Sequence, residues 1–290
     1  MTVLVTGAKG QLGQDVIEEL NKRGIKTVGT DIDDMDITDE TAVFSKINEI
    51  RPGAVIHCAA WTNVDGAEDP ANIETVEKIN VKGTENIAKA CKSVGCKILY
   101  ISTDYVFDGK GDKPWNPDCK DYAPLSVYGK TKLAGEKCVA QNCDKFFIVR
   151  ISWLFGLHGK NFVATMLKLS DTHSSLRVVS DQIGTPTYCR DLASVLADMI
   201  VTDKYGYYHV SNEGGYISWA DFAKEIFRQS GKNTEVIPVT TEEYGLSKAK
   251  RPFNSRLDKS KLTKNGFNLL PTWQDALSRY LKETEQNGNA

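Results

Sequence analysis

A tyrosine and a lysine four positions apart have the clearest chemical potential in this chain. Tyr128 and Lys132 fall in a segment with helical spacing, and residues four apart share one face of a helix. A phenol has an ordinary pKa near ~10, and a nearby ammonium lowers that pKa because it favours the phenolate. Such a pair can donate a proton during reduction of a carbonyl group. The alternative is an exposed surface pair, because this spacing is common.

A polar segment, Ser102-Thr103-Asp104, directly follows an apolar run at 97–101. In open α/β sheets, ligands bind at the carboxyl ends of the strands. We therefore expect the Thr103 hydroxyl to hydrogen-bond the same carbonyl oxygen as Tyr128. A turn or a helix cap is the alternative for these three residues.

Three glycines spaced GxxGxxG follow the first apolar run and precede a helical pattern. Gly7 permits a tight turn, Gly10 lets the backbone approach a pyrophosphate at the helix N-terminus, and Gly13 allows close packing of helix on strand. The spacing therefore predicts a dinucleotide-binding loop. A strand-to-helix turn without a ligand is the alternative.

Asp31 ends the second expected strand, at 26–30. A carboxylate there accepts hydrogen bonds from both hydroxyls of an adenosine ribose and repels a 2′-phosphate. This position favours NADH over NADPH. The alternative is a solvated acidic turn, since Asp33, Asp34 and Asp36 follow.

Alternating strands and helices must position these residues in the first half of the chain. Strands are expected at 3–5, 26–30, 54–56, 97–101 and 146–150, with helical patterns at 12–20, 40–50, 73–94 and 127–139. Strands joined by helical crossovers pair in parallel and carry helices on both faces. The sequence thus predicts an α/β fold, with a Rossmann-type, doubly wound parallel sheet that binds NAD(P) over residues 1–150.

The second half of the chain has shorter elements. Helices fit 161–169, 190–200, 218–230 and 272–283, and strands fit 177–179, 207–210 and 235–237. No repeat or low-complexity linker separates the halves. Residues 151–290 are therefore expected to form mainly a smaller α/β substrate domain, with some segments returning to the first domain.

Composition and charge exclude several classes of function. The 290 residues carry 36 Lys and Arg against 38 Asp and Glu, a net charge of -2 that gives no footprint for nucleic acid. No apolar run approaches the ~20 residues of a membrane helix, and the start lacks a signal-peptide pattern. Seven cysteines without CxxC spacing indicate reduced thiols in the cytoplasm, and four scattered histidines predict no zinc site.

Further motifs accompany these residues, at 59–62, 150–153, 181–187 and 251–255. Together with the glycine loop and the segments at 102–107 and 128–136, they resemble the extended short-chain dehydrogenase/reductases, and within them the dTDP-4-dehydrorhamnose reductase family. The resemblance implies a Rossmann-type domain and a smaller sugar-nucleotide domain. It also implies reduction of the C4 keto group of dTDP-4-dehydro-6-deoxy-L-mannose to dTDP-L-rhamnose. The expected cofactor is NADH, which is preferred, or NADPH.

The resemblance implies roles for individual residues. Tyr128 is the proton donor, Lys132 binds the nicotinamide ribose and polarises Tyr128, and Thr103 completes the catalytic set. The expected cofactor-binding residues are Gly7, Gly10, Gln11, Leu12, Gly13, Asp31, Asp36, Ile37, Ala59, Ala60, Trp61, Tyr128 and Lys132. The expected substrate-binding residues are Thr103, Asp104, Trp153 and Arg251.

Two of the substrate-binding assignments also have a physical basis. Trp153 offers a broad apolar face for a 6-deoxy sugar, with ordinary core packing as the alternative. Arg251 can pair with a diphosphate, with a solvated basic run beside Lys248 and Lys250 as the alternative.

One position departs from the resemblance. Some members of the family form dimers through a metal held by acidic side chains. Here Arg190 stands where an acid is expected, although Asp191 is adjacent. The departure argues against a metal-linked dimer, and the expected state is a monomer or a homodimer.

Two other functions stay open at this stage. One is an NAD-recycling sugar-nucleotide epimerase or dehydratase. A dehydratase typically needs an acid pair near the Tyr–Lys centre, and Asp104 is followed by Tyr105. The other is a non-catalytic regulatory subunit related to that of methionine adenosyltransferase, which the joint presence of Thr103, Tyr128 and Lys132 argues against.

Overall fold

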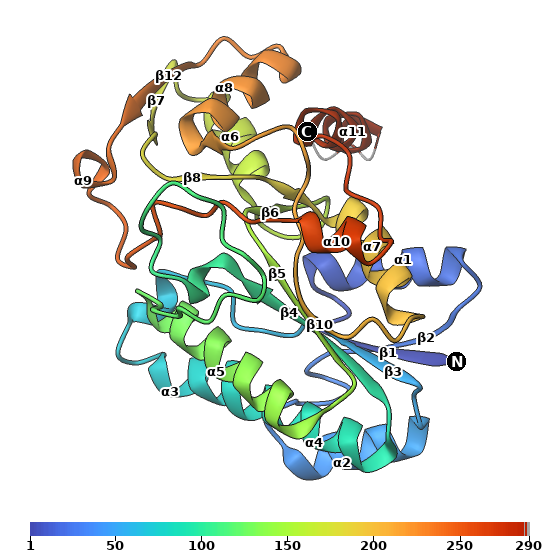
Figure 1. Ribbon diagram of the computed structural model, residues 1–290. Coiled ribbons are helices and arrows are strands. Elements are labelled where there is room, and N and C mark those ends of the chain that lie inside the picture. The colour runs from blue at the N-terminus through green and yellow to red at the C-terminus, as the bar shows by residue number, and fades with distance from the viewer. Residues whose placement is uncertain (287, 289–290) are drawn as a thin grey trace.

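A central sheet of six parallel strands organises the computed structural model, which describes residues 1–286 and 288 (Figure 1). The strands are β1 Thr2–Thr6, β2 Lys26–Thr30, β3 Ala54–His57, β4 Lys97–Thr103, β5 Phe146–Ile151 and β10 Gly206–His209. Their order is β10-β5-β4-β3-β1-β2, so the order reverses between β1 and β3. Open α/β sheets bind ligands at such a switch point. The predicted doubly wound α/β class is confirmed.

Helices cover both faces of this sheet because its strands are apolar on both sides. Val3 and Val5 are fully buried on one face and Leu4 on the other, as the alternation of side chains along a strand requires. The first face packs against α1 Gln11–Lys22 and α7 Cys189–Ile200. The second packs against α2 Glu40–Ile50, α4 Thr84–Val94 and α5 Val127–Asn142 (Figure 1).

The helical stretch predicted at 73–94 is formed, but its hydrogen bonding changes along its length. It consists of α3 Ile73–Glu77, a π-helical segment Lys78–Gly83, and then α4. Such π segments are frequent at functional sites. Asn80 lies in this segment, and its side-chain amide exchanges hydrogen bonds of 2.8 and 3.2 Å with the backbone of Trp61. The π segment thereby holds the chain that leaves β3.

The rest of the chain forms a smaller unit with an aromatic core. Its helices are α6 Phe162–Ser170, α8 Trp219–Ser230, α9 Thr241–Tyr244 and α11 Trp273–Gln286. Its short strand pairs are β12 Glu235–Val239 with β7 Ser175–Val179, β11 Ile217–Ser218 with β8 Ile183–Gly184, and β6 Leu154–Phe155 with β9 Thr187–Tyr188. Phe155, Tyr188, Phe222 and Trp273 are buried in the core of this unit.

Three segments beyond residue 150 lie with the central sheet. Helix α7 packs along α1, and β10 pairs in parallel with β5 (Figure 1). Helix α10 Ser260–Lys264 packs against β10 and buries Leu262 in the core of the sheet. The strand predicted at 207–210 is therefore formed, as an edge strand of the first sheet. We propose the division into 1–150 and 151–290 with this return included. Within residues 1–286 and 288, each helix is too short or too polar to cross a bilayer.

Candidate active site

A cavity of about 1160 Å³ lies along the carboxyl ends of β1 to β5 and reaches α8. Its lining brings together every predicted site residue except Trp61 and Arg251. The predicted residues that line it are Gly7, Gly10, Gln11, Leu12, Gly13, Asp31, Asp36, Ile37, Ala59, Ala60, Thr103, Asp104, Tyr128, Lys132 and Trp153. Residues from five strand ends and one distant helix thus share a single cleft.

The glycine loop has the shape of an anion cradle. Gly7 has a φ of +67°, and a Cβ there would lie 2.8 Å from the backbone nitrogen of Ala59. A Cβ on Gly13 would collide with the backbone of Gly7. Helix α1 begins after Gly10, and no side chain caps its first turn. Its free N–H groups and the positive end of its dipole suit a pyrophosphate.

Asp31 is fixed at the far end of this cradle. Its Oδ2 accepts from the backbone N–H of Lys9 at 2.9 Å, and its Oδ1 accepts from that of Ile32 at 2.9 Å. The Lys9 ammonium reaches Asp33 at 2.6 Å. A carboxylate anchored beside a glycine loop is suited to ribose hydroxyls, so the loop and Asp31 together fit an adenine dinucleotide.

Tyr128 enters the cavity from the first turn of α5. The helix starts at an N-cap, Ser126, whose hydroxyl accepts from the backbone N–H of Gly129 at 3.1 Å. Burial and the nearby Asp104 carboxylate raise the pKa of Tyr128, and the Thr103 hydroxyl only partly offsets them. The expected lowering of this pKa is not found, because burial and Asp104 outweigh the groups that favour the phenolate. The phenol is therefore held protonated, which suits a proton donor.

Lys132 lies one turn along α5 and faces the end of β4. Its ammonium donates to the Ile101 carbonyl at 2.7 Å and lies 4.1 Å from the centre of the Tyr100 ring. Burial lowers its pKa to about 7, against the opposing effect of Glu136. The side chain is thus a buried cation whose charge changes near neutral pH.

Asp104 is a buried carboxylate at the other side of Tyr128. Burial raises its pKa to about 6, while the Ser255 and Thr103 hydroxyls act to lower it. The Thr103 hydroxyl donates to its Oδ1 at 3.0 Å. Its Oδ2 is buried and has no hydrogen-bond partner among the described residues.

The sequence did not indicate two features that shape this site. Trp219 from α8 lines the cavity and stacks on Trp153, although the two are distant in the chain. Beneath Ser102, a buried Glu136 accepts from its hydroxyl at 2.6 Å and pairs with the fully buried Arg150. Neither contact could be predicted from the spacing of nearby residues, because each joins segments that meet only in the folded chain.

Trp61 and Arg251 lie outside the lining. Trp61 donates its indole N–H to the carbonyl of Asn63 at 2.9 Å. The guanidinium of Arg251 makes two bonds to Asp65, at 3.1 and 2.6 Å, so it is paired within the protein.

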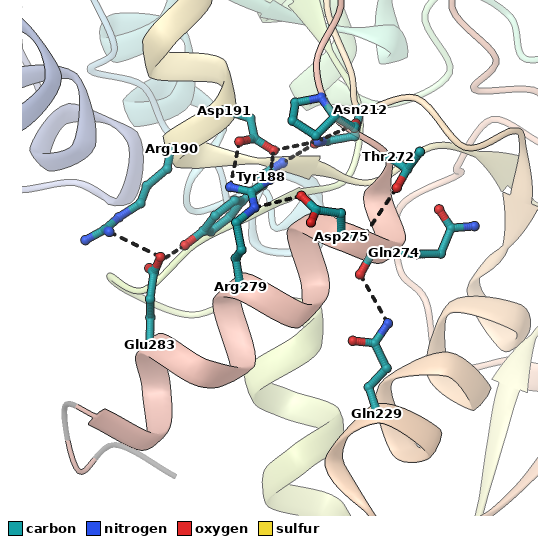
Figure 2. Close-up of polar contacts among 11 residues, drawn as sticks. Tyr188, Arg190, Asp191, Asn212, Gln229, Thr272, Gln274, Asp275, Arg279 and Glu283 are labelled. Atoms are coloured by element: carbon teal, nitrogen blue, oxygen red, sulfur yellow. Dashed lines mark hydrogen bonds and ion pairs between the residues drawn. The ribbon is translucent and has the colours of Figure 1, made fainter.

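Arg190 sits among acidic side chains of α1 and α11. It lies 3.7 Å from Asp15, 3.7 Å from Glu18 and 3.2 Å from Glu283. Figure 2 shows Arg190 and the Tyr188 hydroxyl converging on Glu283. The Arg190 guanidinium therefore supplies the positive charge inside this acidic group. No cluster of side chains that could hold a metal ion is found in the described part of the chain.

The family described as RmlD substrate binding domain matches residues 1–286. The chain belongs to this family. The dTDP-4-dehydrorhamnose reductase of Aggregatibacter actinomycetemcomitans is 42% identical over 290 residues, which covers 95% of this chain and 96% of the relative. The spore coat polysaccharide biosynthesis protein SpsK of Bacillus subtilis is 40% identical, with 97% of each chain covered.

Solved structures extend the similarity to the whole fold. The dTDP-4-dehydrorhamnose reductase of Bacillus anthracis in complex with NADP is 43% identical, with a TM-score of 0.93, and covers 98% of this chain and 99% of that one. The UDP-glucose 4-epimerase of Thermus thermophilus in complex with NAD has a TM-score of 0.81 at 19% identity, over 98% and 99% of the two chains. The second match shows only that the fold is shared.

Proposed function

We propose that this protein reduces the C4 ketone of dTDP-4-dehydrorhamnose, the 4-dehydro-6-deoxy-L-mannose nucleotide, to give dTDP-L-rhamnose. The observation that carries the proposal is the placement of Tyr128, Thr103 and Asp104 in one cavity with the glycine cradle, in a chain of this family. The cradle and Asp31 fit a nicotinamide dinucleotide. When bound, that cofactor supplies a hydride to the ketone carbon.

Tyr128 provides the proton that completes the reduction. Its raised pKa keeps the phenol protonated until negative charge develops on the C4 oxygen. The Thr103 hydroxyl, which donates to Asp104 at 3.0 Å, turns toward that oxygen as its second donor. The two donors come from β4 and α5, which fix their positions beside the developing alkoxide, and donors held in place in this way act most strongly in the transition state.

Lys132 and the loop after β3 hold the nicotinamide end in this proposal. Lys132 offers its ammonium to the ribose beside Tyr128, and Ala59 and Ala60 line the wall there. Trp61, whose backbone Asn80 fixes, is proposed for the same end of the cofactor from outside this lining. Gln11, Leu12, Asp36 and Ile37 line the remaining length of the cofactor site. Trp153 and Arg251 are proposed for the sugar and the diphosphate.

We also propose that NADH binds at least as well as NADPH. The Asp31 carboxylate supports this choice, since it repels a 2′-phosphate. The relative from Bacillus anthracis was solved with NADP, so the preference must be measured on this chain. Calorimetric titration with each cofactor tests it, and much tighter binding of NADPH would contradict it.

We also propose that the protein works in a reducing compartment and forms no metal-linked dimer. All seven cysteines are free thiols, which supports a cytoplasmic location. Arg190 among Asp15, Glu18 and Glu283 supports a monomer, or a homodimer that needs no metal.

The decisive experiment mixes the protein, NADH and dTDP-4-dehydrorhamnose and follows NADH absorbance. Loss of one NADH per sugar supports reduction, whereas conversion without net NADH loss indicates an epimerase and inertness indicates a binding subunit. Tyr128→Phe is the matched variant. It should lower kcat by ~10²–10⁴-fold while NADH still binds, because it removes the acid and keeps the ring. Near-full activity of this variant would rule out Tyr128 as the donor.

A further inference from the structure

Trp153 has a backbone conformation that bulky residues rarely adopt. Its φ is +50°, and Arg51 is the only other non-glycine described residue with a positive φ. Left-handed backbone is unfavourable for a side chain of this size and persists only where the surroundings impose it. Outliers of this kind cluster at ligand sites. The position connects β5 to β6, and its side chain lines the cavity.

Trp219 is the side chain that holds this conformation in place. The two indole rings stack at 3.7 Å between centres with 15° between their planes. The Phe162 ring also packs against Trp219, with 4.6 Å between the ring centres. Gly184 leaves room for the Trp153 ring, because a Cβ there would lie 2.9 Å from its Cε2. The stack is therefore built from β8, α6 and α8 around one strained residue.

The two stacked tryptophans differ from the other three in the chain. Trp61, Trp115 and Trp273 each donate the indole N–H to a backbone carbonyl, at 2.9, 3.1 and 3.0 Å. Within residues 1–286 and 288, Trp153 and Trp219 make no such bond and are half-buried in the cavity wall. The parts of these rings that the stack leaves uncovered, and their free N–H groups, are thus available to a ligand.

We propose that Trp219 is a specificity-determining residue, which orients Trp153 so that the stack forms the wall for the 6-deoxy sugar. The inference rests on the proposed function, because that function supplies the sugar. A hexose without a 6-hydroxyl presents a methyl group and C–H bonds to such a wall. A 6-hydroxyl would lose its hydration there with no partner except the two indole N–H groups. Trp219 acts through Trp153 and is therefore a positioning residue.

Trp219→Ala, Trp219→Phe and the matched control Trp273→Phe test this role. Trp219→Ala should raise KM for the keto sugar roughly three- to tenfold, the usual contribution of an aromatic pair, with NADH affinity unchanged. Trp219→Phe should restore most of the loss. The double variant with Trp153→Ala should be little worse than the poorer single variant, since the two side chains act as a unit. Trp273→Phe removes an indole from the same unit, away from the cavity, and should leave KM as it is.

Circular dichroism adds a readout that does not depend on turnover. Stacked indoles give an exciton couplet, which Trp219→Ala and Trp153→Ala should abolish and Trp273→Phe should keep. Adding dTDP-L-rhamnose to the unmodified protein should preserve the couplet, because the sugar meets an intact stack. Disappearance of the couplet on binding, or an unchanged KM in Trp219→Ala, would overturn the proposal.

Failure of the proposed function gives a different pattern. In that case the unmodified protein consumes no NADH with the keto sugar. Titration of dTDP-L-rhamnose into the unmodified protein and into Trp219→Ala then measures how much the tryptophan stack contributes to the affinity for the sugar nucleotide. Equal affinities, or a joint loss of NADH affinity and melting temperature in Trp219→Ala, would assign Trp219 to folding alone.

Discussion

Lys132 is buried, whereas its spacing from Tyr128 also fitted an exposed pair on the protein surface. The four-residue interval to Tyr128 predicted a shared helix face, and both side chains do line one cavity. The interval could not predict that the ammonium would be buried against the Ile101 carbonyl and the Tyr100 ring. That environment, and not contact with Tyr128, determines its protonation.

NADH binding should therefore depend on pH through Lys132. Its pKa of about 7 means that the ammonium loses its charge as pH rises through neutrality, which weakens its hold on the nicotinamide ribose. The dissociation constant of NADH should rise between about pH 6 and 8. In Lys132→Met it should be higher at pH 6 and nearly flat across this range. Calorimetry at several pH values measures both curves, and parallel curves would assign the titration to another group.

The buried Asp104 carboxylate should lower the free energy of unfolding at neutral pH. Its pKa of about 6 lies above the ordinary 3.8, so the unfolded chain loses this proton first as pH rises. Stability is therefore full below about pH 4 and is lost as pH rises through 6. Asp104→Asn should raise the free energy of unfolding at pH 7 by about 2–3 kcal/mol and lower kcat/KM.

Urea unfolding at pH 4 and pH 7 checks this gain. The advantage of Asp104→Asn should be much smaller at pH 4, where the carboxyl is protonated in the folded chain and still nearly half protonated in the unfolded chain. The exposed Asp112 gives a control, since Asp112→Asn should leave the pH dependence unchanged. An equal gain at both pH values would show that ionisation of Asp104 is not the cause.

At the scale of elements, helix α5 is held to the sheet by a buried ion pair. Arg150 at the end of β5 makes bonds of 2.8 and 2.7 Å to Glu136, and Glu136 accepts from Ser102 at 2.6 Å. The Arg150 guanidinium also donates to the Tyr122 hydroxyl and the Pro117 carbonyl. Because Thr103 follows Ser102, the pair fixes α5, with Tyr128, relative to the end of β4.

Removing one member of this pair should cost far more than removing both. Glu136→Gln leaves a buried guanidinium without its counter-charge and should lower the free energy of unfolding by about 3–5 kcal/mol. The double variant Glu136→Gln/Arg150→Met should recover much of that loss. Glu74→Gln, in the exposed pair with Lys78, should change stability little. Additive losses in the double variant, measured by urea unfolding, would contradict the buried-pair argument.

The elements that could be predicted are those with a local signal. Apolar runs located the strands of the sheet, and the glycine spacing located the turn into α1. The π segment at Lys78–Gly83 was not predicted, since its apolar positions also fit a regular helix. The Trp153–Trp219 stack was not predicted either, because α8 and the end of β5 meet only through the tertiary fold.

At the scale of the whole molecule, the C-terminal half meets the N-terminal half across the cavity. Arg251 lies in the chain between α9 and α10, and Asp65 lies in the loop that follows β3. Their two hydrogen bonds, together with one from the backbone N–H of Ala249 to Asp65 at 2.9 Å, join the halves beside the site. Arg251 was predicted to pair with a diphosphate, with a solvated basic run as the alternative, and sequence alone could not show this internal partner.

We expect the Arg251 guanidinium to exchange Asp65 for the substrate diphosphate. Both are anions that accept paired N–H donors, and the phosphates carry more charge. Arg251→Ala should weaken dTDP binding about tenfold or more, because a charge-assisted hydrogen bond contributes about 1.5–3 kcal/mol. Asp65→Asn removes the competing carboxylate and should leave dTDP binding equal or tighter, measured by titration with dTDP. Equal weakening by both variants, with lower melting temperatures, would instead mean that the pair only fastens the two halves together and that the diphosphate binds elsewhere.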